Sequence, residues 1–130
     1  LLCMDHTLKI CDFGTVSILN MFDQNELLDN TFGTPAFQPP EVIIGPDGFF
    51  GHVKDIWSSG ITLCYIMTGT LPFQGENLGQ LYNSITHNEP LILFDDMDTD
   101  FFDLVTVMLK KNYRSRATLC QIKKKKYALR

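Results

Sequence analysis

The sequence predicts a mainly α-helical fold that opens with a short β-hairpin and a long loop. Apolar residues recur at the helical spacing i, i+3, i+4 and i+7 in the second half of the chain. Residues that cap helices precede these stretches, and glycine or proline follows several of them. Short apolar runs of strand length stand near the N-terminus, before a stretch without periodicity.

The hairpin is predicted from two apolar runs, residues 1–4 and 7–11, which flank a polar pair. Leu8 and Ile10 should point to one face, because side chains alternate along a strand. Residues 14–37 contain few helix signals and no sustained periodicity, so they predict a long loop. A loop of this length inside a domain is usually functional or disordered.

Helices are expected after the loop. Residues 39–43 predict a short helix with proline in its first turn, where the missing N–H costs nothing. Residues 55–68 are apolar on nearly all sides, so this helix should be buried at the centre. Asp55 is placed to cap its start, and Gly69 follows its end. The other helices are expected to begin at a capping sequence in 77–80, to cover 100–111, and to begin at a capping box in 118–121, with a loop over 45–51.

Composition and charge limit the function. The 130 residues fit one domain or part of one, and 45% hydrophobic with 20% charged residues is an ordinary globular balance. The net charge of −4 argues against non-specific binding to nucleic acid, which needs a basic surface. The one basic run, residues 123–126, fits a solvated helix end, a nuclear-import signal or a phosphate-binding patch.

The cysteines and the absence of membrane signals suggest an intracellular protein. The four cysteines are scattered and form no C-x-x-C pair, which favours a reducing compartment. Cys64 and Cys120 lie among helical apolar residues and should behave as small buried hydrophobes. The longest apolar stretch, residues 56–67, is too short and too mixed to span a bilayer, and no signal peptide is visible. We expect a cytoplasmic protein, and a nuclear one too if residues 123–126 direct import.

Two motifs frame the long loop. Asp12-Phe13-Gly14 follows a predicted strand, where the carboxylate is either a turn residue or a ligand for Mg²⁺ and the glycine lets the backbone turn. Gly33-Thr34-Pro35 closes the loop and fits ordinary turn chemistry when it is read alone. Glu41 then stands at the start of a short apolar helix. A carboxylate buried there would need a cation.

Two further motifs lie in the helical half. Asp55-Ile56-Trp57-Ser58-Ser59-Gly60 places an acid before a core aromatic, and a capping aspartate there can also bond a neighbouring loop. Arg116 precedes the last predicted helix. Taken alone, Arg116 and Arg114 fit two surface arginines.

The order and spacing of these motifs carry more weight than any one of them. Asp-Phe-Gly, Gly-Thr-Pro, Pro-Glu, Asp-x-Trp-Ser-x-Gly, Pro-Phe and a late arginine resemble the second half of the eukaryotic protein kinase signature set. The resemblance covers nearly all of residues 1–130, from just after the catalytic loop to the last helix of the C-lobe. It implies a partial serine/threonine kinase domain, α+β when complete, whose N-lobe and catalytic loop are missing from this sequence.

For the start of the chain, the resemblance implies a nucleotide site. Asp12 would hold Mg²⁺ bridging the β- and γ-phosphates of ATP. Cys11, directly before it, would line the ATP pocket, more as a buried inert thiol than as a reactive one. Phe13 would pack between the two lobes, and Gly14 would begin the activation segment.

For the rest of the chain, the resemblance implies a substrate-binding loop and its supports. Thr34, between Gly33 and Pro35, would lie where the residue after the phospho-acceptor binds, with its hydroxyl reaching the catalytic aspartate. Threonine there implies serine/threonine specificity. The other implied supports are a buried ion pair between Glu41 and Arg116, and a bond from Asp55 to the backbone of the catalytic loop.

One departure points to a subgroup. The family usually has Ala-Pro-Glu where this chain has Pro39-Pro40-Glu41, preceded by Phe37-Gln38. This run, with residues 53–63 and 72–77, resembles the liver kinase B group. The calmodulin-dependent kinase kinases share Gly-Thr-Pro-Ala-Phe and are the nearest alternative. Members of the liver kinase B group phosphorylate protein serine or threonine and are activated by a pseudokinase and a scaffold protein. The resemblance implies a protein substrate with a serine or threonine acceptor and the same kind of activators here. The net charge and the absence of a membrane-spanning stretch predict neither nucleic acid nor membrane as a partner.

The sequence is compatible with two functions. The chain is part of an active kinase, or it is a truncated and inactive kinase-like module that binds partners through the helices from Asn77 onward. The glycine-rich loop, the lysine of the third N-lobe strand and the catalytic aspartate of the kinase family are not found in the sequence, so we expect this stretch alone to be inactive.

Overall fold

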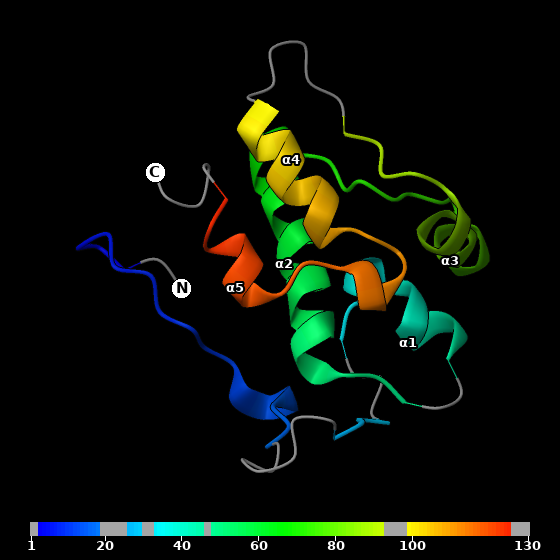
Figure 1. The fold of residues 1–130 in the computed structure, drawn as a ribbon, viewed down its shortest axis with the longest axis horizontal. Helices are drawn as coiled ribbons and strands as arrows, with labels where there is room; N and C mark the ends of the chain where they lie inside the picture. The colour runs from blue at the N-terminus through cyan, green and yellow to red at the C-terminus, as the bar shows by residue number, and fades with distance from the viewer. Residues whose placement is uncertain (1–2, 19–25, 30–32, 46–47, 93–98, 126–130) are drawn as a thin grey trace.

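The fold is a cluster of helices around one long helix, α2, which runs from Gly51 to Thr68 (Figure 1). The computed structural model describes residues 3–18, 26–29, 33–45, 48–92 and 99–125. The other elements, in chain order, are the short 3₁₀ helices and α-helices η1 (Phe13–Thr15), η2 (Pro35–Phe37), α1 (Pro40–Ile44), α3 (Leu78–His87), α4 (Thr99–Met108), η3 (Tyr113–Ser115) and α5 (Leu119–Ile122). The predicted mainly α fold is confirmed.

The predicted N-terminal hairpin is only partly present. The Cys3 N–H donates to the Thr7 carbonyl at 2.9 Å, which closes the expected turn, but no regular strand follows within the described residues. Residues 1–2 lie outside them. Leu8 and Ile10 are 81% and 85% exposed, and an uncovered two-stranded hairpin is marginally stable at best. Figure 1 shows this segment running to the left of the helices.

Helix α2 begins earlier than predicted, so Asp55 is not its cap. The first helical hydrogen bonds run from the Val53 and Lys54 N–H groups to the Phe50 carbonyl, which places Asp55 in the second turn. No side chain caps this end. The prediction at the other end is confirmed: Gly69 has φ of 71° and its N–H donates to the Tyr65 carbonyl at 2.8 Å.

The core lies between α2 and the elements that pack on one side of it. Gly60 lets α2 pack closely against the end of α4, since a Cβ there would come within 3.1 Å of the Met108 side chain and 2.9 Å of the Leu109 side chain. The main core cluster contains Trp57, Ile61, Cys64, Phe73, Ile85, Phe101, Val105 and Leu109. The predicted burial of α2 on all sides is wrong near its C-terminal end, where three successive apolar residues, Tyr65, Ile66 and Met67, are exposed. The described elements leave these side chains uncovered.

The local signals for the shorter helices are confirmed. Helix α1 has its proline in the first turn, and the Asn77 side chain caps α3 by accepting from the Gln80 N–H at 2.9 Å. Thr118 and Gln121 form the capping box of α5. Helix α4 ends at Met108, three residues before the predicted end, because the chain then turns into η3. Within the described residues, no helix is both long and apolar enough to cross a membrane.

Candidate active site

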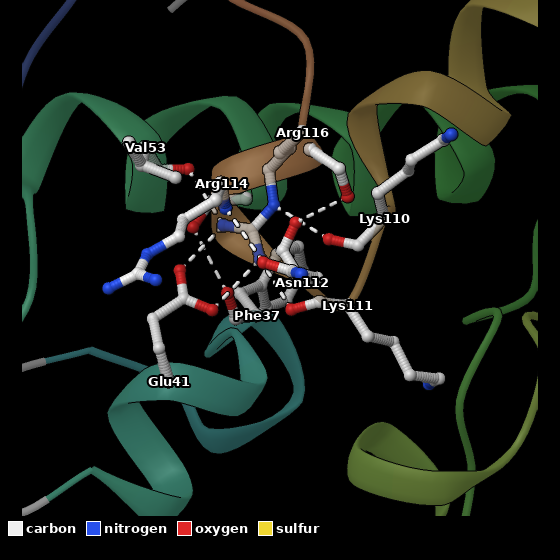
Figure 2. Close-up of polar contacts among 10 residues, drawn as sticks. Phe37, Glu41, Val53, Lys110, Lys111, Asn112, Arg114 and Arg116 are labelled. Carbon is white, nitrogen blue, oxygen red and sulfur yellow. Dashed lines mark hydrogen bonds and ion pairs between the residues drawn. The ribbon is translucent and has the colours of Figure 1, made fainter.

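An ion pair joins α1 to the segment before α5. Arg116 donates from both terminal nitrogens of its guanidinium to the two carboxylate oxygens of Glu41, at 2.6 and 2.8 Å (Figure 2). The Arg116 side chain is fully buried and that of Glu41 is 12% exposed. This is the pair that the kinase resemblance implied, and the prediction that Arg116 has a buried partner is confirmed. The bidentate geometry is the strongest form of such a contact.

Arg116 also holds two backbone segments through three carbonyls. Its nitrogens donate to the carbonyls of Lys110 at 2.9 Å, Val53 at 3.1 Å and Lys111 at 3.4 Å. Figure 2 shows the guanidinium between these carbonyls and Glu41. One side chain therefore ties α1, the start of α2 and the turn after α4 together. The guanidinium also lies 5.0 Å from the ring of Trp57, a cation–π contact.

The loop before α1 is held from two sides. The Ser58 hydroxyl in α2 donates to the Phe37 carbonyl at 3.0 Å, and the buried Gln38 side chain donates to the Gly33 carbonyl at 3.5 Å. Gly33 has φ of 123°, which other residues rarely adopt. Thr34 is exposed and precedes η2, so its side chain faces solvent while its backbone is fixed. Pro35 starts η2.

Ser58 and Gln38 are site residues that the sequence did not single out. Ser58 belongs to the Asp-x-Trp-Ser-x-Gly motif, which was the available signal for it. Gln38 is one of two buried polar or charged residues within the described chain, the other being Arg116. A glutamine carries no local signal of burial.

Asp12 stands apart from this framework. It is exposed, has φ of 63° and ψ of 70°, and directly precedes η1, which contains Phe13 and Gly14. Phe13 is 66% exposed, so the interlobe packing implied for it stays a prediction. Cys11 is exposed, which contradicts the expectation of a buried thiol: the described residues place no core around this segment. Cys120 is exposed as well, which contradicts the expectation of a buried thiol, because the single-turn α5 contains no buried residue.

A cavity of about 460 Å³ separates the N-terminal segment from the start of α2. Asp55 lines it together with Lys54 and Gly33. Asp55 is exposed and accepts no side-chain hydrogen bond from the described residues, so its carboxylate faces the cavity without a partner there. Lys54 lies 4.9 Å from the centre of the Phe49 ring, and burial lowers the pKa of its amine while the charge of Asp55 raises it. The full lining is Thr15, Val16, Ser17, Leu28, Gly33, Phe49, Gly51, His52, Lys54 and Asp55.

The residues described fit only part of a magnesium site. Within them, no three histidine, cysteine or acidic side chains gather as a metal-binding group. Mg²⁺ is commonly held by one or two carboxylates together with nucleotide phosphates, so the exposed Asp12 can supply one ligand. The remaining ligands would have to come from the nucleotide and from other residues.

The helical fold and the buried ion pair are those that the protein kinase resemblance implied. Comparison with known proteins agrees with this class. Residues 1–128 match the protein kinase domain family, and the chain belongs to that family. Members of this family generally use ATP and Mg²⁺.

Two relatives place the chain more narrowly. It is 40% identical over 121 residues to the serine/threonine-protein kinase par-4 of Caenorhabditis elegans, covering 91% of this chain and 19% of par-4. It is 37% identical over 123 residues to the serine/threonine-protein kinase STK11 of Gallus gallus, covering 95% of this chain and 28% of STK11. These relatives support the resemblance to the liver kinase B group. The rice CBL-interacting protein kinase 15 is 44% identical over 89 residues, 68% of this chain and 20% of that protein.

Proposed function

We propose that the protein containing this chain is a serine/threonine kinase of the liver kinase B type, which transfers the γ-phosphoryl group of ATP to a protein hydroxyl. The single observation that carries this proposal is the buried bidentate pair between Glu41 and Arg116. It fixes the end of the proposed activation segment, residues 14–41, to the helical core. The chain spans 19% to 28% of the length of the relatives described above.

In the proposed reaction, Asp12 supplies a carboxylate to the Mg²⁺ that accompanies ATP. The ion neutralises the charge on the phosphates during transfer. The exposure of Asp12 supports this role, since a ligand must reach a nucleotide from outside the helical cluster. Cys11 would lie beside the same nucleotide. The phosphate-binding loop and the proton acceptor would come from other parts of the full-length protein.

Thr34 would act beside the acceptor. Its backbone is fixed by the Ser58 contact to Phe37 and by the Gln38 contact to Gly33, while its side chain is exposed. A hydroxyl held in this way can bond a catalytic carboxylate and border the residue that follows the acceptor. Asp55, with its carboxylate facing the cavity, would hold the backbone of the catalytic loop there.

The proposed partners and location follow the subgroup. A protein with a serine or threonine acceptor would be the substrate, and a pseudokinase with a scaffold protein would be the activators. The protein would act in the cytoplasm, and in the nucleus too if the basic run 123–126 directs import.

Phosphate transfer by the full-length protein tests the proposal. With Mg²⁺ and ATP labelled at the γ-phosphate, we expect label on serine and threonine peptides and none on tyrosine peptides. Asp12→Asn should lower kcat by about two orders of magnitude or more, because metal polarisation contributes several kcal/mol. Asp5→Asn is the control, since Asp5 is exposed on the same segment and accepts its bonds from Thr7. A protein that transfers no phosphate yet stays folded and monodisperse would favour the inactive binding module.

A further inference from the structure

A continuous column of side chains runs from α1 to α3, and we call its five members the column: Glu41, Arg116, Trp57, Phe73 and Lys111. Arg116 binds Glu41 and lies 5.0 Å from the Trp57 ring. Trp57 stacks on Phe73 with 5.6 Å between ring centres and 7° between planes. The Lys111 amine lies 4.5 Å from the centre of the Phe73 ring. Two stacked rings are thus flanked by two cations.

Lys111 is the last member of the column, and it contacts α3. Its amine donates to the Ile85 carbonyl at 2.7 Å, across 26 positions of sequence. Ile85 lies in the last turn of α3, where a carbonyl has no helical N–H partner. A cation at this end of a helix is also favoured by the helix dipole. Burial lowers the pKa of the Lys111 amine and Glu89 raises it, as expected for a charge held partly out of water.

Helix α3 in turn borders the loop that carries Thr34. It packs against both α1 and η2, the two elements that directly follow this residue. Leu81 and Tyr82 of α3 pack on the same core cluster as Phe37 of η2. A shift of α3 would therefore change the support beneath residues 34–38.

We propose that Lys111 is a positioning residue for the protein substrate: by anchoring the last turn of α3, it fixes the surface beside Thr34 on which the acceptor segment lies. This inference rests on the proposed kinase function. Lys110 next to it provides a matched comparison, because its side chain is exposed and only its carbonyl contacts Arg116.

Hydrogen exchange in the full-length protein tests the anchor without needing activity. In Lys111→Met, amides of residues 80–88 and 36–38 should exchange about tenfold faster, as expected when a charged hydrogen bond is lost. Amides of α4 should be unchanged, and so should all amides in Lys110→Met. Lys111→Arg keeps the charge and the donors, and it should restore most of the protection. Faster exchange throughout α4 as well, or no change in α3, would overturn the proposal.

Kinetics test the consequence for the substrate. Lys111→Met should raise KM for a peptide substrate about fivefold to tenfold, with KM for ATP unchanged and with recovery in Lys111→Arg. Equal changes in both KM values, or unchanged kinetics, would overturn the positioning role. A wild-type protein without transferase activity would refute the proposed function and the substrate role with it. The exchange experiment would still decide whether Lys111 anchors α3.

Discussion

Replacing Glu41 by alanine should leave the buried Arg116 guanidinium without its counter-ion. The Arg116 side chain is fully buried, and its remaining acceptors would be the carbonyls of Val53, Lys110 and Lys111. Breaking a buried pair by removing one partner costs about 3–5 kcal/mol. Glu41 is 12% exposed and some acceptors remain for the arginine, so we expect a loss near the lower end, about 3 kcal/mol.

Arg116→Ala should cost more, about 5 kcal/mol. It leaves the Glu41 carboxylate unpaired, removes the donors to three carbonyls and ends the contact with the Trp57 ring. The double variant should lose less than the sum of the two, because the second change removes the charge that the first left unpaired. The coupling energy should be about 2–3 kcal/mol, at the upper end for residues in contact.

Equilibrium urea unfolding of the full-length protein, followed by circular dichroism, measures these losses. Glu76→Ala and Arg114→Ala are the controls, since both side chains are exposed. Each control should change the unfolding free energy by less than about 0.5 kcal/mol. Losses of Glu41→Ala and Arg116→Ala that simply add, or that match the controls, would refute the account of the pair.

Three further predictions concern the helical core. Burial raises the pKa of the Cys64 thiol from 9.0 to about 11. The contribution of the neutral thiol to the unfolding free energy should therefore be complete below about pH 9 and be lost as the pH rises through about 11. The unfolding free energy of Cys64→Ala should lack this pH dependence. Gly60→Ala should cost about 1–3 kcal/mol by overpacking against Leu109, and Ser59→Ala, on an exposed position of the same helix, should cost almost nothing in thermal unfolding. Asn77→Ala should cost about 1 kcal/mol and speed hydrogen exchange mainly in the first turn of α3; equal effects in α4 would contradict the cap.

Features encoded by adjacent residues could be predicted from the sequence. The caps of α3 and α5 and the glycine after α2 depend on residues a few positions apart, so a short stretch of sequence is enough to predict them. The start of α2 was not predictable in this way. No side chain caps it, and the first helical hydrogen bonds go to the Phe50 carbonyl. Asp55 was predicted as the cap only because aspartate is a common capping residue.

Contacts between distant residues divide into two kinds. The pair of Glu41 and Arg116 could be predicted because each residue belongs to a motif of a known family. The contacts of Lys111 with Phe73 and Ile85 belong to none of the sequence motifs described above, and they form only when Phe73, the end of α3 and the turn after α4 come together. The exposure of Cys120 was missed for a related reason, since an apolar pattern over one turn does not say whether that turn packs against the core at all.

We propose above all that Asp12 belongs to a nucleotide site built around this helical framework. A crystal structure of the full-length protein with Mg²⁺ and a non-hydrolysable ATP analogue measures this directly. We predict a carboxylate oxygen of Asp12 about 2.0–2.1 Å from Mg²⁺, as its octahedral geometry requires. The pair of Glu41 and Arg116 should be intact in the same structure. A bound Mg²⁺ nucleotide whose ligands do not include Asp12 would contradict the account.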